Sequence, residues 1–108
     1  MYSIINNVIT IVQGDTATFN ISLEANNSGS LDEYTPAAGD TLIFKVKKHL
    51  SDEVPLIQKT GTTISLNSND TKNLAPGEYI YDVTFISSDN TVIDHVITVT
   101  KFIVKEAL

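Results

Sequence analysis

The sequence predicts an all-β protein whose strands pack as a two-layered sandwich, and three observations support that fold class. Apolar and polar residues alternate with a period of two in several segments, which places one face of each strand in a core and the other in water. β-Branched residues are frequent near both ends of the chain. Turn residues separate the segments at short intervals, so about seven short strands are expected, as in a sandwich or a small barrel.

The clearest strand signal runs from Thr16 to Leu23, where every second residue is apolar. Further strands are expected over residues 8–12, 42–47, 56–59, 64–66, 79–85 and 91–104. The last of these is too long for one simple alternation, which predicts a bulge or burial on both faces. The one helix candidate, Asn69 to Leu74, is so short that we expect at most a single 3₁₀ turn.

Length and composition predict one ordered domain over residues 1–108. A chain of 108 residues buries enough surface for a single core, and 42% hydrophobic with 19% charged residues is typical of a globular domain. The net charge of -6 disfavours nucleic acid and anionic membrane surfaces as partners. Residues Met1 to Val12 resemble neither a signal peptide nor a membrane span, because they lack a basic region and are interrupted by asparagines.

Side chains that carry chemistry are sparse, so no catalytic residue, cofactor or metal site is expected. The chain has no cysteine and no Gly-Xaa-Ser-Xaa-Gly elbow. Of the two histidines, His49 and His95, the second is next to Asp94, and adjacent residues of a strand point to opposite faces. Calcium at an acidic loop is a minor alternative without a supporting ligand pattern; the acidic pairs are Asp32-Glu33, Asp52-Glu53 and Asp89 with Asp94.

A short motif occurs twice, as Gly14-Asp15-Thr16 and as Gly39-Asp40-Thr41, each followed three residues later by phenylalanine. Glycine permits a tight turn and aspartate can accept a hydrogen bond from the backbone, so both copies are predicted to be structural corners that begin strands. Gly77 has the same expected role before the strand that contains Tyr79. The polar segment between the two copies of the motif, residues 25–38, is interpreted as a mobile connection or, less favoured, a binding loop.

The segment Pro76-Gly77-Glu78-Tyr79-Ile80-Tyr81-Asp82-Val83 resembles the approach to strand F of immunoglobulin-like domains. There a tyrosine at the start of the strand bonds back to the preceding turn, and Tyr79 matches it; the bond is expected near Asp70 to Leu74. Tyr81 stands where antibody domains have a cysteine, which implies an immunoglobulin-like sandwich without a disulfide.

Three segments in order, Ile11 to Ile21, Leu42 to Lys48 and Gly77 to Val83, resemble the N-terminal domain of phage baseplate upper proteins and related immunoglobulin-like tail components. The resemblance implies a β-sandwich that docks into a tail-tip assembly, with other virion proteins as partners, made in the bacterial cytoplasm without a signal peptide. The family usually continues into a receptor-binding or fibre portion. The sequence ends at Leu108, so we expect either a small stand-alone virion protein or a separated domain, without an expected receptor-binding role.

The leading hypothesis is therefore a non-catalytic structural module of a bacteriophage or prophage tail or baseplate. The alternative is a bacterial cell-surface module that binds carbohydrate or protein. Excess apolar residues near both ends predict an interface at Tyr2, Ile4, Ile5, Phe102 and Val104. Either a homo-oligomer or chain-swapped arm covers them, or the arm folds back over the terminal strand of its own chain.

Overall fold

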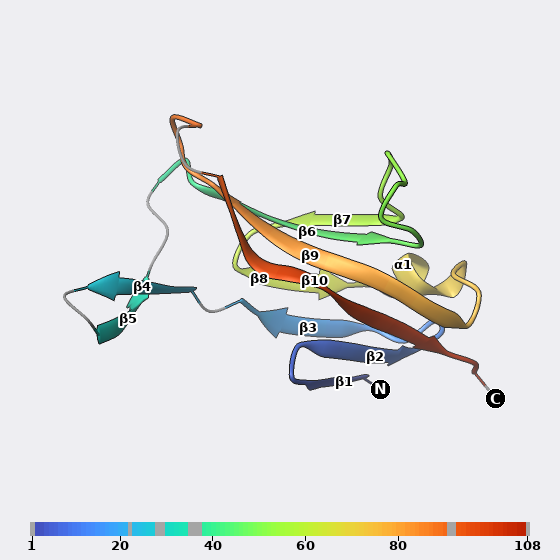
Figure 1. Cartoon of the computed structure of the whole chain (residues 1–108). Helices are drawn as coiled ribbons and strands as arrows, with labels where there is room; N and C mark the ends of the chain where they lie inside the picture. Colours follow the sequence, from blue (N-terminus) through green and yellow to red (C-terminus); the bar gives the residue numbers. More distant parts are fainter. Residues whose placement is uncertain (1, 22, 28–29, 35–37, 91–92, 108) are drawn as a thin grey trace.

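The computed structural model describes residues 2–21, 23–27, 30–34, 38–90 and 93–107, and for residues 23–27 and 30–34 it describes the backbone. The described elements, in chain order, are β1 (Tyr2–Ile5), β2 (Val8–Val12), β3 (Ala17–Asn20), β4 (Leu23–Asn27), β5 (Ser30–Tyr34), β6 (Thr41–Lys47), β7 (Ile57–Thr60), β8 (Thr63–Leu66), α1 (Ser68–Lys72), β9 (Gly77–Ile86) and β10 (Ile93–Lys105). They are drawn in Figure 1.

The strands form a sandwich of one large and one small sheet. The large sheet has six strands in the order β1-β2-β10-β9-β6-β7, and the small sheet pairs β3 with β8. Neighbouring strands are antiparallel except β2 and β10, which run parallel. The order β10-β9-β6 and the separate pair β3-β8 are those of strands G-F-C and B-E in an immunoglobulin-like sandwich. The predicted fold class is confirmed, with more strands than the seven or so expected.

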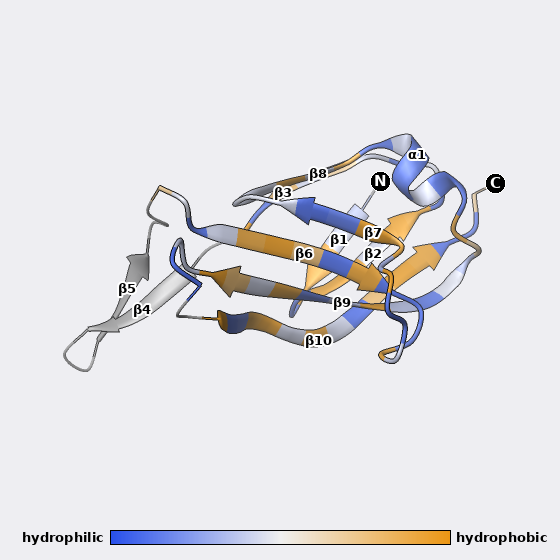
Figure 2. Cartoon of the chain, turned by 90° about the horizontal axis from the view of Figure 1, so that it is seen from above, coloured by the Kyte–Doolittle hydropathy of each residue, from blue (hydrophilic) through white to orange (hydrophobic). Residues whose placement is uncertain are grey.

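The core lies between the inner faces of these two sheets. Ring contacts cross it, because the centroid of Phe44 lies 5.6 Å from that of Phe19 and 5.3 Å from that of Tyr81. Buried and partly buried residues alternate along the whole of β6 and along part of β9. Figure 2 shows orange segments of β6 and β9 interrupted by blue ones. Of the residues predicted for the core, Phe19 is partly buried and packs at the margin of the core. The others are buried: Ile21, Phe44, Val46, Ile64, Leu66, Val83 and Phe85.

A tyrosine corner ties the start of β9 to the turn before it. The hydroxyl of Tyr79 donates a hydrogen bond of 2.7 Å to the carbonyl oxygen of Ala75. The acceptor is next to the range around which the bond is expected, Asp70 to Leu74, so the predicted bond from Tyr79 to the upstream backbone is present. Gly77 begins β9 directly after that turn.

The predicted 3₁₀ turn is a short α-helix, α1, that spans Ser68–Lys72. A capping box starts it: Asn67 Oδ1 accepts from the backbone N–H of Asp70 at 3.0 Å, and the Asp70 carboxylate accepts from the N–H of Asn67 at 2.8 Å. Because the capping box satisfies the backbone N–H groups of Asn67 and Asp70, the helix begins at Ser68, one residue before the expected start at Asn69.

The described residues 25–27 and 30–34 do not belong to the long irregular connection that the sequence predicts for residues 25–38. They belong to the hairpin of β4 and β5, in which Leu23 is opposite Tyr34 and Asn27 is opposite Ser30. In Figure 1 this hairpin extends beyond the end of the sandwich. The prediction failed because the sequences of β4, Leu-Glu-Ala-Asn-Asn, and β5, Ser-Leu-Asp-Glu-Tyr, lack the apolar alternation of a half-buried strand.

The long last strand, β10, contains the predicted irregularity, with register shifts between His95 and Ile97 and between Ile97 and Thr100. Its second half lies between β9 and β2, so Phe102 and Val104 point into the core and are buried. The sequence predicts an interface at these two residues, and that prediction is wrong because both side chains belong to the core, where the Phe102 ring centroid lies 6.4 Å from that of Phe44.

The N-terminal arm is strand β1, which pairs with β2 of its own chain and forms the edge of the large sheet. Asn6 and Asn7 join the two strands with positive φ angles of 51° and 66°. That geometry is a type I′ hairpin turn, for which asparagine is a favoured residue. The arm thus lies beside β2 rather than over the terminal strand.

Candidate functional site

The first Gly-Asp corner is fastened to the helix. The backbone N–H of Gly14 donates to Thr71 Oγ1 at 2.9 Å, and that hydroxyl donates to the carbonyl oxygen of Asp15 at 3.2 Å. The side-chain amide of Gln13 adds a bond of 2.8 Å to the carbonyl oxygen of Leu74. Gly14 has a φ of 85°, which other residues rarely adopt. These contacts join the β2–β3 turn to α1.

The second corner contacts the turn between β9 and β10. Asp40 Oδ1 accepts from the backbone N–H of Ser88 at 2.9 Å. A Cβ atom on Gly39, whose φ is 90°, would lie 2.8 Å from Ser88 Cβ. This corner therefore needs glycine both for its conformation and for the close approach of the turn. Neither corner presents a group arranged for chemistry.

The two histidines lie on different elements, His95 on β10 and His49 in the turn after β6. His95 Nδ1 lies 3.1 Å from the hydroxyl of Thr84, its cross-strand neighbour. His49 is exposed at a turn, with Nδ1 3.9 Å from the Asp52 carboxylate. Among the described residues, no three histidine, aspartate or glutamate side chains lie close enough together to hold a metal ion.

An ordered loop between β6 and β7 displays large apolar side chains. Leu50 is 70% exposed and Val54 79% exposed, and Leu56 is exposed as well. The loop has a defined shape: the Asp52 carboxylate accepts from the N–H of His49 at 2.9 Å, and the N–H of Leu56 donates to the carbonyl oxygen of Val46 at 2.7 Å. Apolar side chains held this way in water are typical of a protein-binding surface.

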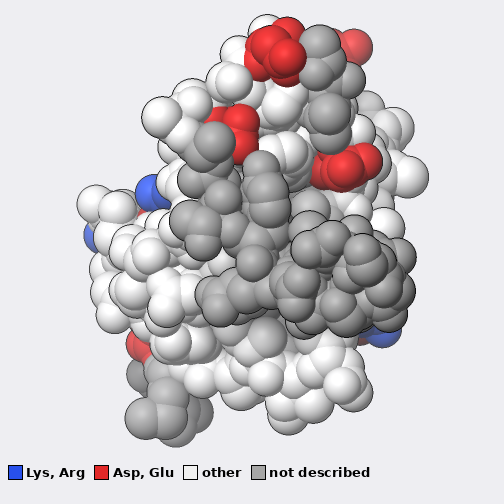
Figure 3. Space-filling view, turned by 90° about the vertical axis from the view of Figure 1, so that its left-hand side faces the viewer, with Lys and Arg blue, Asp and Glu red and all other residues white. Residues whose placement is uncertain are grey.

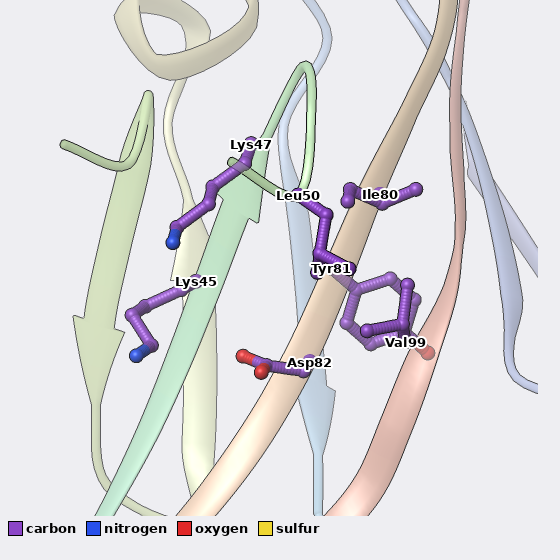
Figure 4. Close-up of a pocket in the computed structure, with 7 residues that line it drawn as sticks. All are labelled: Lys45, Lys47, Leu50, Ile80, Tyr81, Asp82 and Val99. Atoms are coloured by element: carbon purple, nitrogen blue, oxygen red, sulfur yellow. The ribbon is translucent and has the colours of Figure 1, made fainter. Parts of the chain in front are cut away.

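Leu50 reaches over the outer face of the large sheet, where it lies near Ile80 and Val99 (Figure 4). We call Leu50, Ile80 and Val99 the outer-face patch. Lys45 and Lys47 of β6 lie on one side of it, as the close-up shows, and Asp82 lies below. The hollow that these side chains line is small, at about 30 Å³, whereas pockets for drug-sized ligands measure about 300 to 1,000 Å³. The patch therefore suits contact with a protein surface better than a drug-sized ligand.

Lys48, by contrast, is not part of this face. Its ammonium lies 4.6 Å from the centre of the Tyr79 ring and donates to the carbonyl oxygen of Glu78 at 2.9 Å. The three clustered lysines of the sequence are thus divided between the outer face and the tyrosine corner. They do not form one basic patch.

A larger cleft of about 350 Å³ opens at the side of the sandwich, between β1, β3 and β10. We call it the side cleft. Its surface is both polar and apolar, and its lining consists of Ile4, Asn7, Ile9, Phe19, Asn20, Ile21, Tyr81, Val83, Val96 and Ile97. The Tyr81 hydroxyl donates to the carbonyl oxygen of Asn7, and burial raises the pKa of Tyr81 to about 12. This phenol stays protonated at neutral pH and acts as a hydrogen-bond donor within the cleft.

Sequence reasoning did not identify Leu50, Val54 or Leu56. Their signal was present, because three large apolar residues lie within seven positions around a proline, outside any alternating pattern. Two of the predicted interface residues, Ile4 and Ile5, are exposed, whereas Tyr2 is half-buried and its hydroxyl donates to the carbonyl oxygen of Thr18 at 2.7 Å. The predicted interface residues are therefore not one surface.

Comparisons with known proteins add no family. The sequence matches no protein-family model, and no curated protein matches it. In the part of the chain that the structure describes, no helix has the length and apolar character needed to cross a membrane.

Proposed function

We propose that this chain is a non-catalytic assembly module of a bacteriophage or prophage tail or baseplate, which docks onto other virion proteins. The observation that carries the docking role is the display of Leu50 and Val54 on an ordered loop. Burying such side chains against a partner gains about 1.5 to 3 kcal/mol for each side chain that becomes fully buried.

The outer-face patch extends this loop surface onto the sheet. Leu50 belongs to both, and Val99 of β10 is half exposed beside it. Protein interfaces commonly have an apolar centre with a polar rim, and Lys45, Lys47 and Asp82 supply such a rim. The patch and the loop therefore suit a partner surface with an apolar centre.

The assignment to a tail or baseplate is supported by the resemblance described above, whose segments include β3, β6 and the start of β9. These segments build the core and the tyrosine corner, so the resemblance concerns the scaffold. Small disulfide-free sandwiches are a scaffold on which exposed loops can supply the contacts between neighbouring subunits.

Mass spectrometry of purified particles tests the proposal. Particles induced from the source bacterium, or grown from the source phage, should contain the chain in stoichiometric amount after density-gradient purification. Recovery from the washed cell-wall fraction and not from particles would favour the cell-surface alternative and overturn the proposal.

Complementation then tests the docking surface. In a strain that lacks the gene, Leu50→Asp with Val54→Asp should fail to restore incorporation of the chain into particles, because two exposed carboxylates would be buried at the contact. The control is Thr63→Asp, because Thr63 is exposed and lies at the start of β8, outside the β6–β7 loop. Leu56 lies in that loop, so a substitution there cannot serve as a control. Equal incorporation of all variants would exclude the loop as the docking surface.

A further inference from the structure

Among the strands that the structure describes, β1 is an outer strand of the large sheet with no partner on its far side, so its backbone is available for pairing. The two-residue turn at Asn6 and Asn7 makes Ile5 and Val8 a hydrogen-bonded pair, and bonded pairs alternate along the hairpin. The next bonded pair is Ser3 with Thr10. The N–H and C=O groups of Tyr2 and Ile4 therefore point away from β2, toward the outside of the sheet.

The opposite edge of the same sheet is protected, which makes β1 distinctive. Strand β7 carries Lys59, whose ammonium lies 3.0 Å from the Asp70 carboxylate. A charged residue on an edge strand discourages pairing with another chain. Strand β1 has the sequence Tyr-Ser-Ile-Ile, without charge, proline or bulge, and Ile5 is 68% exposed.

The edge of β3 is less accessible than that of β1. The N–H of Ile21 donates to the carbonyl oxygen of Thr62, so these two residues extend the β3–β8 ladder as a hydrogen-bonded pair. Because bonded and non-bonded pairs alternate, Thr18 and Ser65 form a non-bonded pair, and the carbonyl oxygen of Thr18 points away from β8. The hydroxyl of Tyr2 already occupies that oxygen. Strand β1 thus covers part of the β3 edge, while its own edge stays open.

The distribution of charge favours a second copy of this chain as the occupant. Residues 1–14 contain no charged side chain, whereas the whole chain carries -6. All seven lysines follow residue 44, and the view of the hairpin end in Figure 3 shows carboxylates with lysines only at the margins. Two acidic molecules repel each other on most approaches, and contact through β1 brings uncharged segments together.

We propose that two copies of the chain form a dimer by antiparallel pairing of β1 with β1 across a two-fold axis. Only one register uses all the outward groups, with Tyr2 opposite Ile4 of the partner subunit and Ser3 opposite Ser3 of the partner subunit. About four backbone hydrogen bonds join the strands, and the small serine side chains meet at the axis, where paired residues lie closest. The two large sheets become one continuous sheet.

The same register completes an apolar surface. Tyr2 and Ile4 are opposite the buried residues Ile11 and Ile9, so they share the inner side of the sheet. Tyr2 also packs against Phe19, with the ring centroids 6.5 Å apart. Placing Tyr2 beside Ile4 of the partner subunit forms an aromatic–aliphatic cross-strand pair at the rim of the side cleft. The dimer does not depend on the proposed role in a virion.

Sedimentation equilibrium of the whole chain from about 10 μM to about 1 mM tests the dimer, since a single strand pair is a small interface with a dissociation constant in that range. The wild-type chain should change from monomer to dimer with concentration. Ile4→Pro removes one outward N–H and no bond to β2, so it should weaken dimerisation at least about tenfold.

A second variant, Ile4→Lys, covers the case in which proline disturbs the hairpin, because it keeps the backbone intact and places a charge on each copy near the axis. Val54→Lys is the matched control, since it exchanges an exposed apolar residue for lysine away from β1 and should dimerise like the wild type. A wild-type monomer at about 1 mM, or unchanged dimerisation in both Ile4 variants, would overturn the proposal. Loss of dimer in Val54→Lys alone would assign the contact to the β6–β7 loop instead.

Discussion

The two Gly-Asp-Thr corners have the same local sequence and are held in different ways. The first, at residues 14–16, contacts the fully buried hydroxyl of Thr71 on α1. The second, at residues 39–41, contacts the exposed turn at Ser88 through the Asp40 side chain. The motif specifies a turn and the entry to a strand, whereas the tertiary partner determines how much the corner contributes to stability.

The contrast continues into the strands that follow. The second corner leads to Phe44 on β6, a strand with neighbours on both sides, and Phe44 is fully buried. The first leads to Phe19 on β3, which has one neighbouring strand and leaves the ring partly buried. The second corner, whose contact at Ser88 is exposed, thus precedes Phe44, the more buried of the two phenylalanines. Because strength of the corner and burial of the ring do not go together, substitutions can test the two separately.

The largest expected effect is at the phenylalanines. Phe44→Ala should lower the free energy of unfolding by about 3 to 5 kcal/mol, because it removes a ring from the centre of the core and leaves a cavity. Phe19→Ala should cost about 1 to 2 kcal/mol, because part of that ring already faces water. Equilibrium unfolding in urea measures both, and equal losses would contradict the difference in burial.

A smaller effect is expected at the buried hydroxyl. Thr71→Val keeps the shape of the side chain but leaves the N–H of Gly14 and the carbonyl oxygen of Asp15 without this partner, and should cost about 1 to 3 kcal/mol. Amide hydrogen exchange at Gly14 should become faster. Thr71→Ser retains the hydroxyl and is the control. Unchanged stability in Thr71→Val would mean that water satisfies the corner equally well.

Much of the fold could be predicted because the alternation of apolar residues is local. Phe44, Val46 and Val83 were predicted for the core from period alone, and the structure buries all three. The hairpin of β4 and β5 could not be predicted in this way, since neither strand has the alternation of a half-buried strand. The burial of Phe102 depends on the parallel pairing of β10 with β2, which joins opposite ends of the chain.

The candidate surfaces were less predictable than the core for a related reason. Exposure of Leu50 and Val54 follows from the path of the β6–β7 loop, which apolar composition does not reveal. Thr71 was missed because a threonine in a polar helix turn gives no sign that its hydroxyl will be buried between two backbone groups. Ile4 and Ile5 could be singled out, because apolar residues at a chain end are exposed unless a strand covers them.

The smallest effect is expected at the second corner. Asp40→Ala removes the acceptor for the N–H of Ser88, but that amide belongs to an exposed turn where water can replace the carboxylate. The free energy of unfolding should fall by about 0.5 kcal/mol, in the range of surface substitutions. Asp40→Asn keeps an acceptor oxygen at the same place and should be closer to the wild type. Exchange at the Ser88 amide should be faster in Asp40→Ala, while the Gly14 amide at the other corner should be unaffected. A loss as large as that of Thr71→Val would show that the exposed corner is as strongly held as the buried one, and the distinction between the two corners would then be wrong.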